Sequence, residues 1–322
     1  MQSATSAEMR TWGRYVGNRY ASFDNVVWLI GGDTDPSAVR SKVREVVDGI
    51  REYDTRHLMT AHSEAESSPV TSWPGESWVA INGVYSYDVD KLHQHYETAY
   101  QVTPTMPFFM FESAYENERG VTSRQLRAQA YWSMLSGGMG YVFGGCPIWH
   151  FGSVNWCGTT NWKASLNDAG SISMQYANRL FASRPWHTLV PDLSHTTLTA
   201  GYGTYGTAAY ATTARASDGA TVIAYLPTSR QVSIDMTRVS GTQANAYWFE
   251  PSSGSVTAIG THGTTGTRTF TPPDVGDWVL VLDDASKASP PPGFSDGPAP
   301  DTVVGFESLA NDAVLGTFGG IT

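Results

Sequence analysis

The chain of 322 residues has few charged side chains and only two cysteines. Charged residues make up 16% of it, and the formal net charge is −10. Because nucleic acids and anionic membranes attract basic surfaces, we expect neither of them as a partner. No apolar run approaches the roughly 20 residues that a membrane-spanning helix needs. Nothing in the sequence indicates an obligate protein partner.

The first residues, MQSATSAEMRTWG, contain no apolar core of the kind that a secretory signal has, so the sequence predicts no signal peptide in this chain. Cys146 and Cys157 flank a short Trp-rich segment. They could form a disulfide outside the cell or remain separate thiols, and two cysteines alone barely favour either state. A catalytic thiol at Cys146, with His150 four residues later, is a further interpretation with little in its support.

Several motifs of catalytic and cofactor sites are also missing. No G-x-S-x-G turn is present for a nucleophilic serine. The pair Gly31-Gly32 lacks the G-x-G-x-x-G spacing of a dinucleotide site. His93 and His95 lie two residues apart on a predicted helix and point to different faces, which argues against a metal site. We therefore expect no cofactor and no metal.

The first 190 residues alternate short apolar runs with helical patterns, which indicates βα units and a parallel sheet. The runs that read as strands are 26–30, 57–61, 78–85, 107–112 and 140–145. They are apolar almost throughout, and burial on both faces favours an α/β barrel. A (β/α)8 barrel has eight strands. We therefore expect residues 1–190 to form the C-terminal part of such a TIM barrel, about strands 4 to 8, without its first three units.

The pattern changes at about residue 195 to short β runs that are separated by turn residues. Ser217-Asp218-Gly219 joins two such runs and predicts a hairpin. The whole segment 195–284 is expected to form an all-β sandwich. Residues 285–300 are rich in Pro, Gly and Ser and predict a linker. Residues 301–322 are expected to begin a further module or to form a disordered tail.

Two carboxylates, Asp33 and Glu112, each follow an apolar run directly or after two glycines. In α/β barrels the carboxyl ends of the strands carry the chemistry. Two carboxylates at one mouth can hold different protonation states, which glycoside hydrolysis requires of its acid and its nucleophile or base. Aromatic and polar side chains on the same loops would suit sugar rings. The candidate substrate-binding residues are His62, Asn82, Tyr85, Tyr87, Tyr115 and Trp149.

Other interpretations of the same residues stay open at this point. Gly31-Gly32-Asp33 could be a tight turn with a helix-capping acid. Glu116 and Glu118 lie close to Glu112, and any of the three could be a solvated loop acid. His62 could be a structural hydrogen-bonding group.

The motifs RYVGNRYASFDNVVWLIGGD, FESAYEN, RAQAYWSMLSGGMGYVFG and SRPWHTLVPD resemble those of the apiosidase-like glycoside hydrolases, family 140 and its relatives. The segments AYLP, YWFEPSSG and DWVLVL resemble the β domain, named for collagen binding, that follows the barrel in those proteins. The resemblance covers about residues 8–284. It implies retaining hydrolysis of a glycosidic bond, with Asp33 at the end of the fourth barrel strand as general acid/base and Glu112 at the end of the seventh as nucleophile. It also implies a plant or microbial polysaccharide as substrate and a secreted or periplasmic location.

A competing class is a non-catalytic protein that grips polysaccharide or collagen with a dead barrel and a β-sandwich. The presence of both carboxylates argues against a dead barrel. A half-open barrel would also expose apolar faces and an unpaired sheet edge. We therefore expect this chain alone to be unstable or inactive.

Overall fold

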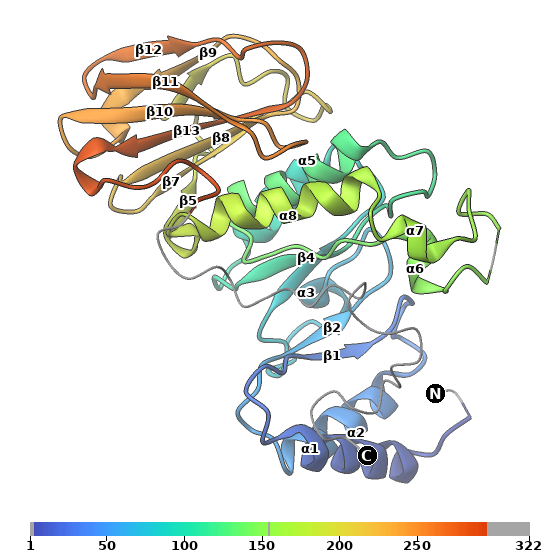
Figure 1. Cartoon of the computed structure of the whole chain (residues 1–322). Helices are drawn as coiled ribbons and strands as arrows, with labels where there is room; N and C mark the ends of the chain where they lie inside the picture. The colour runs from blue at the N-terminus through green and yellow to red at the C-terminus, as the bar shows by residue number, and fades with distance from the viewer. Residues whose placement is uncertain (1–2, 154, 295–322) are drawn as a thin grey trace.

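The computed structural model describes residues 3–153 and 155–294 (Figure 1). Helices and short strands alternate up to Ala182, and strands dominate after Leu189. The helices are α1 (Ser6–Tyr20), α2 (Arg40–Arg51), α3 (Pro69–Ser72), α4 (Leu92–Tyr100), α5 (Ser123–Leu135), α6 (Cys146–Trp149), α7 (Trp162–Ser165) and α8 (Ala169–Ala182). The prediction of an α/β region followed by a β-rich region is confirmed. In the part of the chain that the structure describes, no helix has the length and apolar character to cross a bilayer.

The strands of the first region are β1 (Trp28–Gly31), β2 (Met59–His62), β3 (Asn82–Tyr85) and β4 (Phe108–Glu112). β1 pairs with β2 and β3 pairs with β4, both in parallel. The amide of Ala80 donates to the carbonyl of Met59, which joins the two pairs. The predicted strand 140–145 is reduced to two isolated parallel bridges, Met110 with Tyr141 and Glu116 with Gly145. The parallel segments thus follow one another in chain order.

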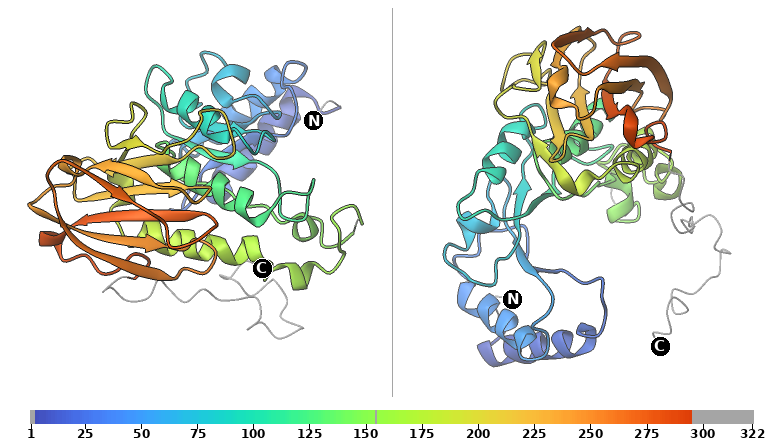
Figure 2. Two further views of the ribbon diagram at one scale, coloured as in Figure 1. Left: turned by 90° about the horizontal axis from the view of Figure 1, so that it is seen from above. Right: turned by 90° about the vertical axis from the view of Figure 1, so that its left-hand side faces the viewer.

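Helices α1 and α2 lie at the far end of the molecule from the β-rich region (Figure 2). A capping box of Thr5 and Glu8 begins α1, because each residue satisfies a free amide of the other. The two helices approach closely at Gly13, where a Cβ atom would lie 2.2 Å from the carbonyl oxygen of Val46. α2 buries its apolar face in a cluster that Ile30 of β1 shares. The outer edge of β1 has no partner strand among the described residues, and Leu29 is 47% exposed.

The β-rich region consists of two antiparallel sheets with a common core. Its strands are β5 (Leu189–Pro191), β6 (Leu198–Ala200), β7 (Thr212–Ala216), β8 (Thr221–Leu226), β9 (Val232–Asp235), β10 (Gln243–Phe249), β11 (Val256–Gly263), β12 (Thr267–Phe270) and β13 (Trp278–Asp284). One sheet has the order β11-β10-β13-β8-β7-β5 and the other β12-β9-β6. Alternate residues of β8 and β13 point into this core, as expected for strands with a period of two. Ile223 and Tyr225 of β8 and Val279 and Val281 of β13 lie on the other face, in a cluster with the helices.

Helices α5 and α8 pack against the six-stranded sheet (Figure 1). Tyr131 of α5 stacks on Tyr225 of β8, with ring centroids 4.7 Å apart. Two buried ion pairs cross the same boundary, Arg127 with Asp277 and Arg184 with Asp283. One hydrophobic cluster therefore contains side chains from both regions.

Part of the predicted linker packs against the end of α8. The amide of Gly293 donates to Ser183, and Arg184 donates to the carbonyl of Pro290. Residues 295–300 of the predicted linker and the predicted module or tail 301–322 lie outside the described residues.

Candidate active site

The carboxyl ends of the four parallel strands lie next to one another. Gly31 of β1 is in register with His62 of β2, and Tyr85 of β3 with Glu112 of β4. Asp33 follows two residues after Gly31. Gly31 has φ +98°, a conformation that side chains with a Cβ rarely adopt, and it turns the chain out of β1. The parallel pairing thus gathers residues from distant parts of the sequence at one edge.

Glu112 has two side-chain partners at this edge. Its Oε2 lies 3.0 Å from His62 Nε2, and its Oε1 accepts a hydrogen bond of 2.9 Å from the hydroxyl of Tyr115. The His62 ring stacks on Phe111 and meets the edge of Tyr85. The Glu112 side chain keeps 16% of its surface exposed. The carboxylate is therefore held in one orientation and stays accessible.

The two ring nitrogens of His62 both face oxygen atoms. Nδ1 lies 3.0 Å from the carbonyl oxygen of Ser63, which can only accept. Nε2 faces the Glu112 carboxylate, so a proton must lie between this nitrogen and the carboxylate oxygen. The hydrogen bond to Glu112 raises the pKa of His62 above 6.5, while burial opposes the rise. Burial raises the pKa of Glu112, but the hydrogen bonds from His62 and Tyr115 outweigh it and bring the pKa below 4.5. Both directions favour an imidazolium beside a carboxylate.

Asp33 lies at the same edge and is exposed. Its negative charge contributes to raising the pKa of His62, after the larger effect of Glu112. It also contributes to raising the pKa of Tyr85, for which burial is the main cause. Asp33 is thus close enough to act on two side chains that themselves interact with Glu112.

Aromatic residues extend the site beyond Glu112. The hydroxyls of Tyr85 and Tyr87 lie 3.2 Å apart. The guanidinium of Arg119 lies 4.1 Å from the centroid of the Tyr87 ring, in a cation–π contact. Trp149, predicted for the same site, lies at the end of α6, is 56% exposed and contacts the rings of His150 and Trp156 instead. No sequence signal points to Arg119, because its contact depends on the positive φ of the loop that carries it.

Asn82 does not join this group. The sequence places it near the carboxyl end of a strand 78–85, but the strand begins at Asn82, which is in register with Phe108 at the start of β4. Its side chain is 1% exposed and lines a cavity with Thr98 and Val102 near α4. The expectation that Asn82 lies at the mouth with the carboxylates is therefore corrected.

The two other acids that follow β4 have structural partners. Glu116 accepts hydrogen bonds of 2.6 and 3.0 Å from the amides of Gly170 and Ser171 in the first turn of α8. Carboxylates at this end of a helix satisfy free amides and the helix dipole. Glu118 accepts hydrogen bonds within its own loop. Of the three acids, Glu112 is the one paired with His62.

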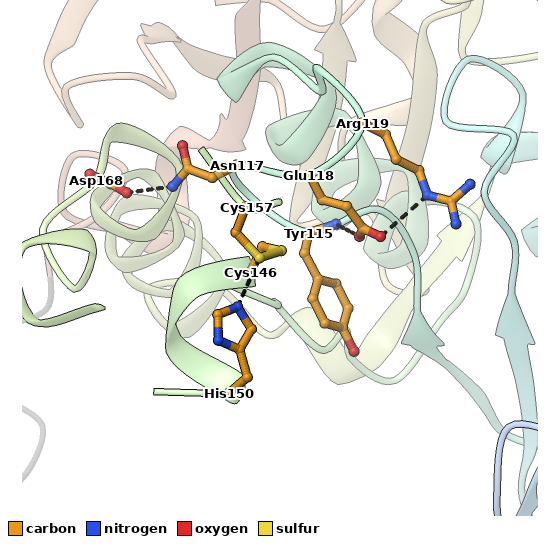
Figure 3. The surroundings of a disulfide bond; sticks show 8 residues. All are labelled: Tyr115, Asn117, Glu118, Arg119, Cys146, His150, Cys157 and Asp168. Atoms are coloured by element: carbon orange, nitrogen blue, oxygen red, sulfur yellow. Dashed lines mark hydrogen bonds and ion pairs between the residues drawn. A yellow bond between two sulfur atoms is a disulfide. The ribbon is translucent and has the colours of Figure 1, made fainter. Parts of the chain in front are cut away.

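Cys146 and Cys157 form a disulfide, with Cα atoms 5.5 Å apart (Figure 3). His150 Nε2 lies 2.8 Å from the sulfur of Cys157. The ligand atoms of these three residues lie within 4.8 Å of one another. Because a disulfide sulfur is not a thiolate, this oxidised cluster offers a metal only one nitrogen ligand. The same bond removes Cys146 as a candidate nucleophile.

Known protein families match both regions of the chain. Residues 1–188 match the family described as "Apiosidase-like, catalytic domain", and residues 190–283 match "Putative collagen-binding domain of a collagenase". A solved glycoside hydrolase has a TM-score of 0.78 and 23% identity over 88% of this chain and 70% of its own. A family 5 glycoside hydrolase from Bacteroides vulgatus ATCC 8482 has the same TM-score and identity, over 88% of this chain and 67% of its own. A search of curated proteins found no match.

The overall fold is thus shared with glycoside hydrolases. Because the matched segment spans more than half of the chain, the protein belongs to the apiosidase-like catalytic domain family and is a glycoside hydrolase. The resemblance noted in the sequence is confirmed for both regions.

Proposed function

We propose that the protein hydrolyses a glycosidic bond with retention of configuration, on side chains of a plant or microbial polysaccharide. Glu112 is the nucleophile and Asp33 the general acid/base. The observation that carries the proposal is the orientation of Glu112 by His62 and Tyr115, at the strand edge that also bears Asp33.

In the first step the ionised Glu112 attacks the anomeric carbon, and the bond to the leaving oxygen breaks. Asp33, in its protonated form, gives its proton to that oxygen, and a glycosyl ester of Glu112 remains. In the second step Asp33 takes a proton from water, the water oxygen bonds to the anomeric carbon, and the ester bond breaks to restore the Glu112 carboxylate. Retention needs a carboxyl separation of about 5–5.5 Å in the complex with substrate.

The proposed roles of the other residues follow from their contacts. The imidazolium of His62 stabilises the Glu112 carboxylate that is released in the second step. Tyr115 donates a hydrogen bond to the other oxygen of the same carboxylate. Tyr87 and Trp149 offer ring faces to the sugar, whereas Tyr85 is 3% exposed and holds the Tyr87 hydroxyl at 3.2 Å.

We further propose that β1 to β4 correspond to strands 4 to 7 of a (β/α)8 barrel and that segment 139–142 stands for strand 8. Their parallel order along the chain supports this assignment. The two packed sheets of residues 195–284 are then an ancillary β-sandwich. The disulfide supports a secreted or periplasmic location, because such bonds persist in oxidising compartments.

The Glu112→Gln variant tests the mechanism. We expect the full natural protein to lose at least about a thousandfold in kcat on aryl glycosides, because an amide cannot form the ester. The matched control is Glu118→Gln, which changes an acid of the same loop and should keep turnover. NMR of the first product should show retained anomeric configuration. Activity of Glu112→Gln within severalfold of the unmodified protein would remove Glu112 as nucleophile, and an inverted product would exclude the two-step mechanism.

A further inference from the structure

The loop between the two cysteines exposes aromatic side chains to solvent. Trp149 is 56% exposed, Phe151 70% and Trp156 55%. Large apolar rings are costly to leave in water, and such groups on a surface mark binding sites. We call Trp149 and Trp156 the indole pair, since their ring centroids lie 6.2 Å apart.

The buried ring of His150 supports the indole pair. The ring of His150 is buried and contacts both indoles, with centroids 5.0 Å from Trp149 and 5.9 Å from Trp156. His150 is itself in contact with the sulfur of Cys157, whose disulfide closes the loop. The two indoles are therefore fixed on a buried support, so little conformational entropy is lost when a ligand binds to them.

The loop is also attached to the segment that carries the candidate nucleophile. The amide of Cys146 donates to the carbonyl of Glu116. The ring of Tyr115, whose hydroxyl donates to Glu112, packs on Gly144, where a Cβ atom would lie 2.3 Å from it. The indole pair is thus connected to Glu112 through Tyr115 and the residues next to Cys146.

We propose that the indole pair binds the main chain of a neutral polysaccharide beside the bond that is cleaved. This inference rests on the proposed glycoside hydrolysis and extends its sugar-binding surface from Trp149 to Trp156. The indoles are tilted by 52°, so each can cover the C–H face of a different sugar unit in a chain that twists. The whole chain carries a net charge of −10, which disfavours an anionic glycan.

Native gels that contain soluble polysaccharide test the proposal without any need for turnover. The probes are arabinoxylan, xyloglucan and mixed-linkage β-glucan as neutral chains, and homogalacturonan as an anionic chain. We expect the unmodified protein to be retarded by at least one neutral chain. Trp156→Ala should weaken that affinity on the order of tenfold, because the contact of one ring corresponds to about one decade in Kd. Trp12→Ala is the matched control, since Trp12 is 55% exposed on α1, away from this loop.

Reduction of the disulfide with dithiothreitol should lower the affinity for the polysaccharide as Trp156→Ala does. The reason is that the loop is then no longer closed, and His150 no longer holds the two indoles in place. The proposal is overturned if no neutral gel retards the protein, if homogalacturonan alone does, or if Trp156→Ala and Trp12→Ala migrate alike. The Glu112→Gln variant should be retarded as the unmodified protein is. If the proposed hydrolysis fails, the unmodified protein shows no turnover but is still retarded by a neutral chain. If the binding site fails, Trp156→Ala is retarded as strongly as the unmodified protein.

Discussion

Replacing Arg127 with methionine measures how strongly the helices and the β-rich region are joined. Arg127 donates to Asp277 through Nε at 2.8 Å and Nη2 at 2.7 Å, and both side chains are nearly buried. Without Arg127, Asp277 keeps one hydrogen bond, from the Tyr225 hydroxyl. A buried carboxylate that loses its cation typically costs 3–5 kcal/mol. We expect the free energy of unfolding to fall by about that amount.

Urea unfolding followed by tryptophan fluorescence and circular dichroism gives this free energy. The double variant R127M/D277N should lose less than R127M alone, because no charge remains buried in it. Arg14→Met is the control, since the ion pair of Arg14 with Glu52 is on the surface and should contribute little to stability. The reasoning is refuted if R127M stays within about 1 kcal/mol of the unmodified protein, or if the double variant is the less stable of the two.

Two further predictions concern the candidate site and the packing of α1. The raised pKa of His62 means that its contribution to stability is present below pH 6.5 and is lost as the pH rises through the folded-state pKa. The lowered pKa of Glu112 means that its contribution is present above pH 4.5 and is lost as the pH falls through the folded-state pKa. The difference in unfolding free energy between the unmodified protein and His62→Gln should therefore be greatest between pH 4.5 and 6.5, and a flat difference would contradict the ion pair. Gly13→Ala should destabilise the protein by about 1–3 kcal/mol, because the new methyl would clash with α2. Gly263→Ala, where nothing lies within 4 Å, is its control, and equal melting temperatures would contradict the clash.

The strands of the first region could be predicted from their apolar runs, but their limits could not. Trp78, Val79 and Ile81 are buried although they precede the strand, because a loop also contributes to the core. Their apolar side chains made the predicted strand longer than β3, so that Asn82 was placed near its carboxyl end although it is the first residue of β3. At 140–145 the backbone near Gly140 makes only one bridge to β4, although the run itself reads as a strand.

The candidate site depends on contacts between residues far apart in the chain. Asp33 and Glu112 could be proposed from their positions after apolar runs, and the parallel order of the strands predicts that their ends meet. The contact of His62 with Glu112 spans 50 residues and depends on side-chain geometry that no local pattern encodes. The disulfide likewise follows from the fold of the loop, since a separation of 11 residues is compatible with either redox state.

The shared hydrophobic cluster has a consequence for how the gene can be divided. The family boundaries at residues 188 and 190 suggest two independent modules. Tyr131 and Leu180 are nevertheless buried together with Tyr225 and Val281 from beyond that boundary. A protein cut at residue 189 would present these side chains to water, and each half would tend to aggregate. Ligand-binding work on the β-rich half should therefore keep the helices that cover it.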